Sequence, residues 1–201
     1  MQHRHSLPGL RRGIRRWSDG RKIKWFLDER FSPRLLKSIE LEMREKQFHS
    51  GLHLMLLGVE ILSGFLAGRE PGVETFCSFM RRYFDRLLSS SARTPRYRRG
   101  VVDRDPDGRS PRSIAEVIWW AFRCGFRDSG AVYPGGSLAE RSRYYCRCYR
   151  RVGLRLDVHK FYRDFLRAYQ SYSSDAYSDY LVRQRFVRRF DQLFGGGAQA
   201  R

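Results

Sequence analysis

Apolar residues recur three and four residues apart over most of this chain, which is the spacing of one face of an α-helix. Leu35, Ile39 and Met43 show the pattern in its simplest form, with mostly polar residues between them. The spacing predicts helices over residues 32–47, 49–67, 73–88, 113–124, 159–172 and 174–194. Because the helix over 49–67 is apolar nearly all round, we expect it at the centre with the others packed on it.

Capping and helix-breaking residues suggest where these helices begin and end. Ser32-Pro33 offers a hydroxyl cap followed by a proline, whose missing N–H is harmless at the first helical position. Gly68 can adopt the left-handed conformation that terminates a helix, and Gly125 is expected to end the helix over 113–124.

The pattern changes period between residues 143 and 158. Cys146 and Cys148 flank Arg147, and apolar residues alternate with charged ones from 154 to 158. Strict alternation is typical of a strand with one buried face, so we expect a short hairpin here. The predicted fold class is mostly α, a helical bundle of about six helices with one short β-hairpin near residues 143–158.

The chain is long enough for one domain with its own core. We expect an irregular basic arm over residues 1–31 that docks near Ile23, a single helical domain over 32–194 and a flexible tail over 195–201. Residues 89–111 are rich in Ser, Arg, Pro, Gly and Asp, which predicts a long exposed loop between the third and fourth helices.

Charge changes this picture more than composition does. A hydrophobic fraction of 41% excludes wholesale disorder, whereas 40 Lys and Arg against 21 Asp and Glu give a net charge of +19. Such an excess favours an anionic partner, most plausibly nucleic acid. Only five of the 40 basic residues are lysine, so the arginine content could also reflect a GC-rich genome.

No membrane span or secretory signal is expected. The most apolar stretch, residues 52–67, is shorter than a span of about 20 residues and includes His53 and Glu60. The N-terminus is rich in arginine without a continuous apolar stretch, which faintly resembles an organellar transit peptide but not a signal peptide. We expect a cytoplasmic protein with reduced cysteines.

The closely spaced Cys146 and Cys148 are the obvious candidates for metal ligation. Structural zinc usually needs two ligand pairs, and the five histidines supply no matching second pair. We therefore expect these thiols, like those of Cys77 and Cys124, to be small core residues, and we expect no metal and no cofactor.

Arg44 and His49 form a pair that could carry chemistry. A histidine can act as general acid or base on a ribose hydroxyl, while an arginine grips the phosphate and stabilises its developing charge. The simpler alternative is that His49 begins a helix and Arg44 is solvated, because chance spacing of this kind is frequent in an arginine-rich chain.

Three segments together resemble a known family. They are residues 48–68 (FHSGLHLMLLGVEILSGFLAG), 79–84 (FMRRYF) and 121–125 (AFRCG). Their order is similar to that of uncharacterised bacterial HEPN-like helical proteins, over roughly residues 48–190. The resemblance implies an all-helical domain, and it implies a homodimer because enzymatic HEPN members cleave RNA as dimers with an Arg and a nearby His.

Carried over to this chain, the family arginine is Arg123, and the position of the family histidine is Asp128. A carboxylate cannot replace an imidazole, so the resemblance implies a degenerate site or a different task for Asp128. One such task is an ion pair with Arg123. Arg44 and His49 match the family spacing but precede the apolar helix.

Arginine and tyrosine interleave in two further segments, where they could grip a phosphate backbone and stack on unpaired bases. The candidate nucleic-acid-binding residues are Arg93, Arg96, Arg98, Arg99, Arg147, Arg150 and Arg151. The alternative is that the tyrosines pack on the helices and the arginines form a solvated face.

The leading functional hypothesis is a nucleic-acid-binding HEPN-like protein with RNA as the expected partner, in which ribonuclease activity is uncertain. The rival is a non-catalytic helical module that binds an acidic protein. A nuclease that uses Arg44 and His49 is a third hypothesis.

Overall fold

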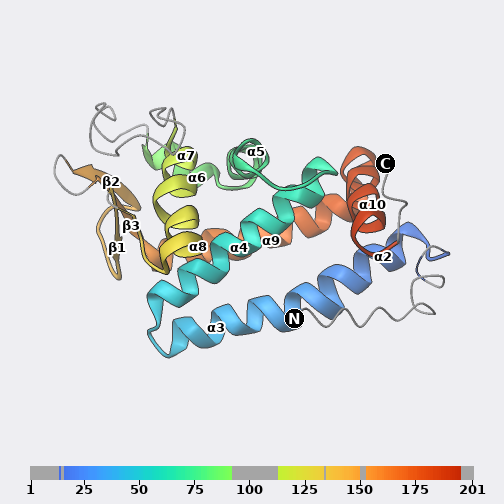
Figure 1. The fold of residues 1–201 in the computed structure, drawn as a ribbon, viewed down its shortest axis with the longest axis horizontal. Coiled ribbons are helices and arrows are strands. Elements are labelled where there is room, and N and C mark those ends of the chain that lie inside the picture. Colours follow the sequence, from blue (N-terminus) through green and yellow to red (C-terminus); the bar gives the residue numbers. More distant parts are fainter. Residues whose placement is uncertain (1–13, 15, 92–112, 134, 150–152, 196–201) are drawn as a thin grey trace.

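The structure is a computed structural model that describes residues 14, 16–91, 113–133, 135–149 and 153–195. These residues form seven helical runs and a three-stranded sheet, which confirms the mostly α fold class. The sheet lies at one end of the long axis and the last helix at the other (Figure 1).

The helix predicted at the centre is confirmed. α4 (Phe48–Ala67) ends at Gly68, which has a left-handed φ of 68°. α4 is long and apolar enough to span a membrane, but 61% of its apolar window is buried inside the protein. It is the helix on which the others pack, diagonally across the middle of the molecule (Figure 1).

The first helix begins earlier than predicted. It comprises α2 (Asp19–Phe26), the π-helical stretch η1 (Leu27–Leu36) and α3 (Lys37–Arg44). Ser18 caps it by accepting a hydrogen bond from the backbone of Arg21. The expectation of an irregular arm is therefore wrong for residues 19–31, and residues 1–13 and 15 lie outside the described part of the chain.

Pro33 lies inside this helix, so the predicted start at Ser32-Pro33 is also wrong. In an α-helix its ring would clash with the carbonyl of residue 29, and it can donate no hydrogen bond. The π-helical turns around it widen the backbone spiral, which accommodates the ring without ending the helix.

The predicted third helix is divided in two. α5 (Val73–Tyr83) follows the Pro71-Gly72 break, and α6 (Asp85–Ser91) begins after Phe84, whose φ of −117° and ψ of 46° depart from helical values. Phe84 is fully buried, so packing of this ring accompanies the break. The predicted loop beyond Ser91 lies outside the described residues up to 112.

The fourth helix is longer than predicted. α7 (Ile114–Val117), the π-helical η2 (Ile118–Cys124) and α8 (Gly125–Ser129) are continuous, with Ser113 as cap. Gly125 is helical and does not end the run, which stops instead at Gly130 with a φ of 70°. A side chain at Gly125 would meet the Ala131 carbonyl at 2.5 Å, so this glycine allows the returning chain to pass close by.

The predicted hairpin is confirmed and gains a third strand. β2 (Cys146–Tyr149) pairs antiparallel with β3 (Gly153–Asp157), and β1 (Gly136–Ala139) adds parallel to the other edge of β3. Leu154, Leu156 and Cys146 are buried on one face of this sheet. The intervening residues therefore lie on the opposite face.

The last two helices meet later than predicted. α9 (Val158–Ser178) is continuous past residue 173, and Asp179 separates it from α10 (Tyr180–Phe194). The Asp179 carboxylate accepts hydrogen bonds from the backbone of Leu181 and Val182, which caps α10. The predicted boundary at 172–174 is wrong because Tyr172 and Ala176 are both fully buried on one continuous helical face.

Aromatic rings join the first helix, α4 and α10 into one core. Phe26 lies 4.1 Å from Phe65, and Phe65 lies 4.6 Å from Phe186, measured between ring centroids. Lys22 adds an ion pair to Asp191 at 2.9 Å beside these rings. These contacts hold α10 against the C-terminal half of α4 (Figure 1).

Candidate functional site

Arg123 is buried between η2 and α4. Its side chain is 9% exposed, and Nε donates to Glu60 Oε2 at 2.5 Å, while Nη2 forms an ion pair with the same carboxylate oxygen. The partner is thus Glu60 on α4, and the expectation of an ion pair with Asp128 is wrong. Nη1 is buried with no hydrogen-bond partner among the described residues.

Asp128 is exposed on α8 and has a partner of its own. Arg127 donates Nε to Asp128 Oδ1 at 2.6 Å and Nη2 to Oδ2 at 3.2 Å, and the Tyr133 hydroxyl donates to Oδ2 at 3.3 Å. The Arg127 hydrogen bond is the main cause that lowers the pKa of Asp128 below its usual 3.8. Asp128 is therefore an anion at neutral pH and cannot serve as a general acid.

Two histidines of α4 lie against Phe126 of α8. The His53 ring stacks on Phe126 with centroids 5.2 Å apart, and the His49 ring approaches its edge at 6.5 Å. Burial, and then the charge of Arg123, lowers the pKa of His53 below its usual 6.5, against the opposing effect of Glu60. His53 is therefore neutral at pH 7.

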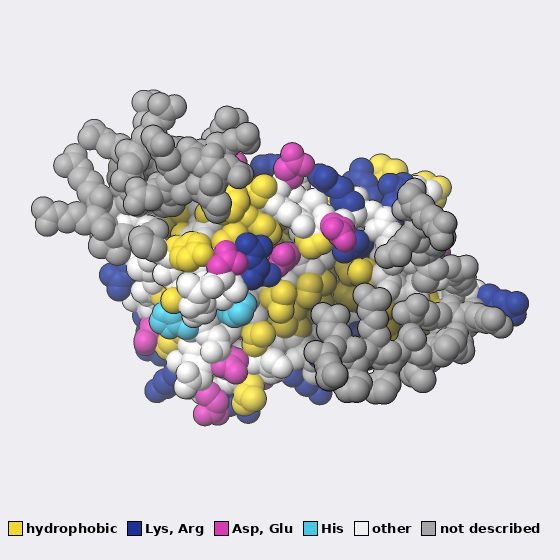
Figure 2. All heavy atoms as spheres, viewed as in Figure 1, with side chains coloured by type: hydrophobic (Ala, Val, Ile, Leu, Met, Phe, Trp, Pro, Cys, Tyr) yellow, Lys and Arg dark blue, Asp and Glu magenta, His cyan; other side chains and the backbone are white. Residues whose placement is uncertain are grey.

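His53 was missed in the sequence, although its position seven residues before Glu60 places both on one face of α4. Figure 2 shows histidine side chains beside a mixed group of acidic and basic side chains on this face of the molecule. The Arg123–Glu60 pair and the His53–Phe126 stack tie α4 to the η2–α8 run, whereas Asp128 pairs only with the nearby Arg127 and Tyr133 among the described residues.

Arg44 and His49 belong to different contacts. Arg44 lies in the last turn of α3, where its side chain is 68% exposed and pairs with Glu40 at 3.3 Å. His49 begins α4 and faces Phe126. The structure therefore places His49 against Phe126, three residues after Arg123, and leaves Arg44 paired with Glu40 on its own helix.

The exposed face of the sheet brings basic residues together. Arg147 of β2 is directly opposite Arg155 of β3. The Arg147 guanidinium lies 4.7 Å from the centroid of the Tyr144 ring, and that of Arg143 lies 6.0 Å from it. Tyr144 is 44% exposed, so one side of the sheet presents an aromatic ring beside the guanidinium groups of Arg143 and Arg147.

Arg147 was predicted as a binding residue, but Arg155 was not. The alternation of residues 154–158 already places Arg155 on the exposed face, so this signal was present in the sequence. The other predicted binding residues lie outside the described part of the chain: Arg93, Arg96, Arg98, Arg99, Arg150 and Arg151.

The described cysteines behave as core residues. Cys77, Cys124 and Cys146 are buried, which confirms that expectation for them. Burial is the main cause that raises the pKa of Cys77 to about 11, so its thiol is protonated at neutral pH. Over the described residues, no three His, Cys, Asp or Glu side chains gather into a metal site.

No protein-family model, curated protein or solved structure matches this chain.

Proposed function

We propose that this protein binds nucleic acid, and RNA in particular, through the exposed face of the sheet. The observation that carries the proposal is the direct pairing of Arg147 with Arg155 beside the exposed ring of Tyr144. Single-stranded RNA suits this surface because its unstacked bases can stack on aromatic rings and on guanidinium planes.

The cross-strand arginine pair supports a bound anion. A phosphate bound at this face would accept charge-assisted hydrogen bonds from guanidinium groups on both strands, β2 and β3. The net charge of +19 agrees with such a partner.

The proposal assigns no RNA cleavage to Arg123 and Asp128. Phosphoryl-transfer chemistry would require Arg123 to reach a phosphate, whereas its guanidinium is buried and paired with Glu60. Asp128 is held by Arg127 and lacks an exchangeable proton at neutral pH. In terms of the HEPN resemblance, the protein would be a degenerate relative that retains binding without catalysis.

Fluorescence polarisation with single-stranded RNA of about 16 nucleotides, near the upper end of known site sizes, tests the proposal. Tyr144→Ala should weaken binding roughly tenfold, because stacking on one aromatic ring contributes about 1–3 kcal/mol. Tyr144→Phe keeps the ring and should bind like the unmodified protein. Tyr177→Ala is the matched control, because Tyr177 is 42% exposed at the far end of α9.

Arg155→Gln should also weaken RNA binding. Equal affinity of the Tyr144→Ala and Tyr177→Ala variants would contradict the role of the sheet face. Binding to polyglutamate but not to RNA at low salt would instead favour the acidic-protein hypothesis. Comparison with DNA of the same sequence tests the preference for RNA.

A further inference from the structure

A second basic site lies far from the sheet, between α5 and α10 (Figure 1). It is a groove of about 830 Å³ whose walls come from the end of α4, from α5 and from α10. The side chains that give it charge are Arg69, Arg81, Arg82, Arg185, Arg188 and Glu74. Five arginines thus line one groove, and Glu74 is the single carboxylate among the described residues that line it.

The arginines of the groove differ in their partners. Arg69 pairs with Glu74 at 2.8 Å, and Arg82 pairs with two aspartates of the α9–α10 corner at 2.7 and 3.3 Å. Arg81 donates to the Ser78 hydroxyl at 3.1 Å and has no ion pair with a described residue. Arg185 and Arg188 have no ion pair within the described part of the chain. The groove therefore carries excess positive charge.

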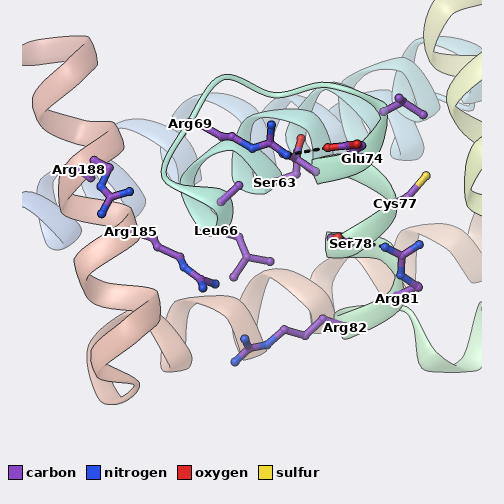
Figure 3. A pocket seen from close by; sticks show the side chains of 13 residues that line it. Ser63, Leu66, Arg69, Glu74, Cys77, Ser78, Arg81, Arg82, Arg185 and Arg188 are labelled. Carbon is purple, nitrogen blue, oxygen red and sulfur yellow. Dashed lines mark hydrogen bonds and ion pairs between the residues drawn. The ribbon is translucent and has the colours of Figure 1, made fainter.

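The positions of these side chains favour a shared ligand. Figure 3 shows Arg185 and Arg82 reaching from opposite walls toward the space beneath Leu66, with Arg81 on the far side. Leu66 and Val73 add apolar side chains to the lining.

The packing of α10 fixes one wall of the groove. A Cβ atom at Gly68 would lie 3.1 Å from the Arg185 carbonyl oxygen and 3.2 Å from its Cα. The end of α4 therefore lies directly against the backbone of Arg185. This contact positions the Arg185 side chain opposite α5, so the packing of α4 against α10 fixes one wall of the groove.

We infer that this groove binds phosphate groups. Guanidinium forks match the geometry of phosphate oxygens, and cations from two opposing walls suit a ligand with more than one phosphate. The volume lies in the range of small-molecule sites, about 300–1,000 Å³. The phosphates could belong to a free polyphosphate or to the backbone of a nucleic acid, and the site stands independently of the sheet face.

The test uses isothermal titration calorimetry of the full chain with inorganic pyrophosphate. The unmodified protein should bind, and the double variant Arg185→Gln/Arg188→Gln should bind at least about tenfold more weakly, because charge-assisted hydrogen bonds contribute about 1.5–3 kcal/mol each. The control is Arg34→Gln/Lys37→Gln, which removes the same charge from exposed positions on the first helix. Thermal unfolding should show all three proteins folded.

The inference is overturned if pyrophosphate does not bind, or if the two double variants bind it equally. If pyrophosphate binds in the groove, competition with other ligands identifies the source of the phosphates. Displacement of pyrophosphate by RNA of about 16 nucleotides assigns the groove to the nucleic-acid backbone, whereas displacement by ATP alone assigns it to a free polyphosphate. Tyr144→Ala should leave pyrophosphate binding unchanged, which separates this site from the sheet face.

Discussion

At the scale of single residues, the contact with the clearest energetic consequence is the buried pair of Arg123 and Glu60. Their side chains are 9% and 15% exposed, so either charge left alone would be poorly hydrated. Arg123→Met should therefore lower the free energy of unfolding by about 3–5 kcal/mol, the usual cost of removing one partner of a buried pair. Urea denaturation followed by circular dichroism measures this change.

The double variant Glu60→Gln/Arg123→Met should be more stable than Arg123→Met alone, because no uncompensated charge remains inside. Arg127→Met serves as the control, since the Arg127–Asp128 pair is exposed and should change stability by less than about 1 kcal/mol. Equal losses in Arg123→Met and Arg127→Met would show that the Arg123–Glu60 contact is not a buried pair in solution.

The sequence identified Arg123 but not its partner. Glu60 lies 63 residues earlier, and no local spacing connects the two. Asp128 was the nearby candidate, but Arg127 is adjacent to it and occupies both of its oxygens. A buried partner on another helix depends on how helices pack, which periodicity does not specify.

At the scale of elements, the junction of α4 and α10 depends on Gly68. Its φ of 68° disfavours any side chain by about 1–2 kcal/mol, and a Cβ atom would also press on the backbone of Arg185. Gly68→Ala should therefore destabilise the protein by more than the conformational cost alone. Thermal unfolding monitored by circular dichroism gives the comparison.

Gly130→Ala isolates the conformational part of that effect. Gly130 has nearly the same φ, 70°, yet a Cβ atom there would meet nothing within 4 Å. We expect a smaller loss of stability for Gly130→Ala than for Gly68→Ala, and the difference measures the contact with α10. Equal losses would mean that α10 can move away from the end of α4 at no cost.

Helical periodicity predicted the helices better than it predicted their ends. Pro33 and Gly125 resemble a start and a stop, but both lie inside continuous helices. Pro33 is accommodated by π-helical turns, and Gly125 is required by the returning chain at Ala131. Both reasons come from backbone geometry and tertiary packing, so the local sequence could not supply them.

The sheet was only half predicted for a related reason. The alternation in residues 146–157 fixes which side chains of β2 and β3 face the core. β1 is four residues long, follows a glycine-rich turn and has no alternation of its own. β1 pairs directly with β3 although β2 comes between them in the sequence, and only the folded chain shows this pairing.

At the scale of the whole molecule, two of the places where basic side chains gather among the described residues are well separated. One is the sheet face with Arg147 and Arg155, and the other is the groove with Arg185 and Arg188. They lie toward opposite ends of the long axis, as the positions of β2 and α10 show (Figure 1). This separation predicts that anion binding depends on position and not only on net charge.

The salt dependence of RNA binding distinguishes local contacts from a diffuse field. For single strands, the logarithm of affinity falls with the logarithm of salt concentration with a slope of about −0.7 for each neutralised phosphate. Arg147→Gln/Arg155→Gln should therefore make the slope shallower by about 1.4, the share of two phosphate contacts. Arg34→Gln/Lys37→Gln removes equal charge from the first helix and should leave the slope unchanged. Fluorescence polarisation between about 50 and 200 mM KCl measures both slopes, and an equal change in the two variants would mean that RNA responds to the total charge alone.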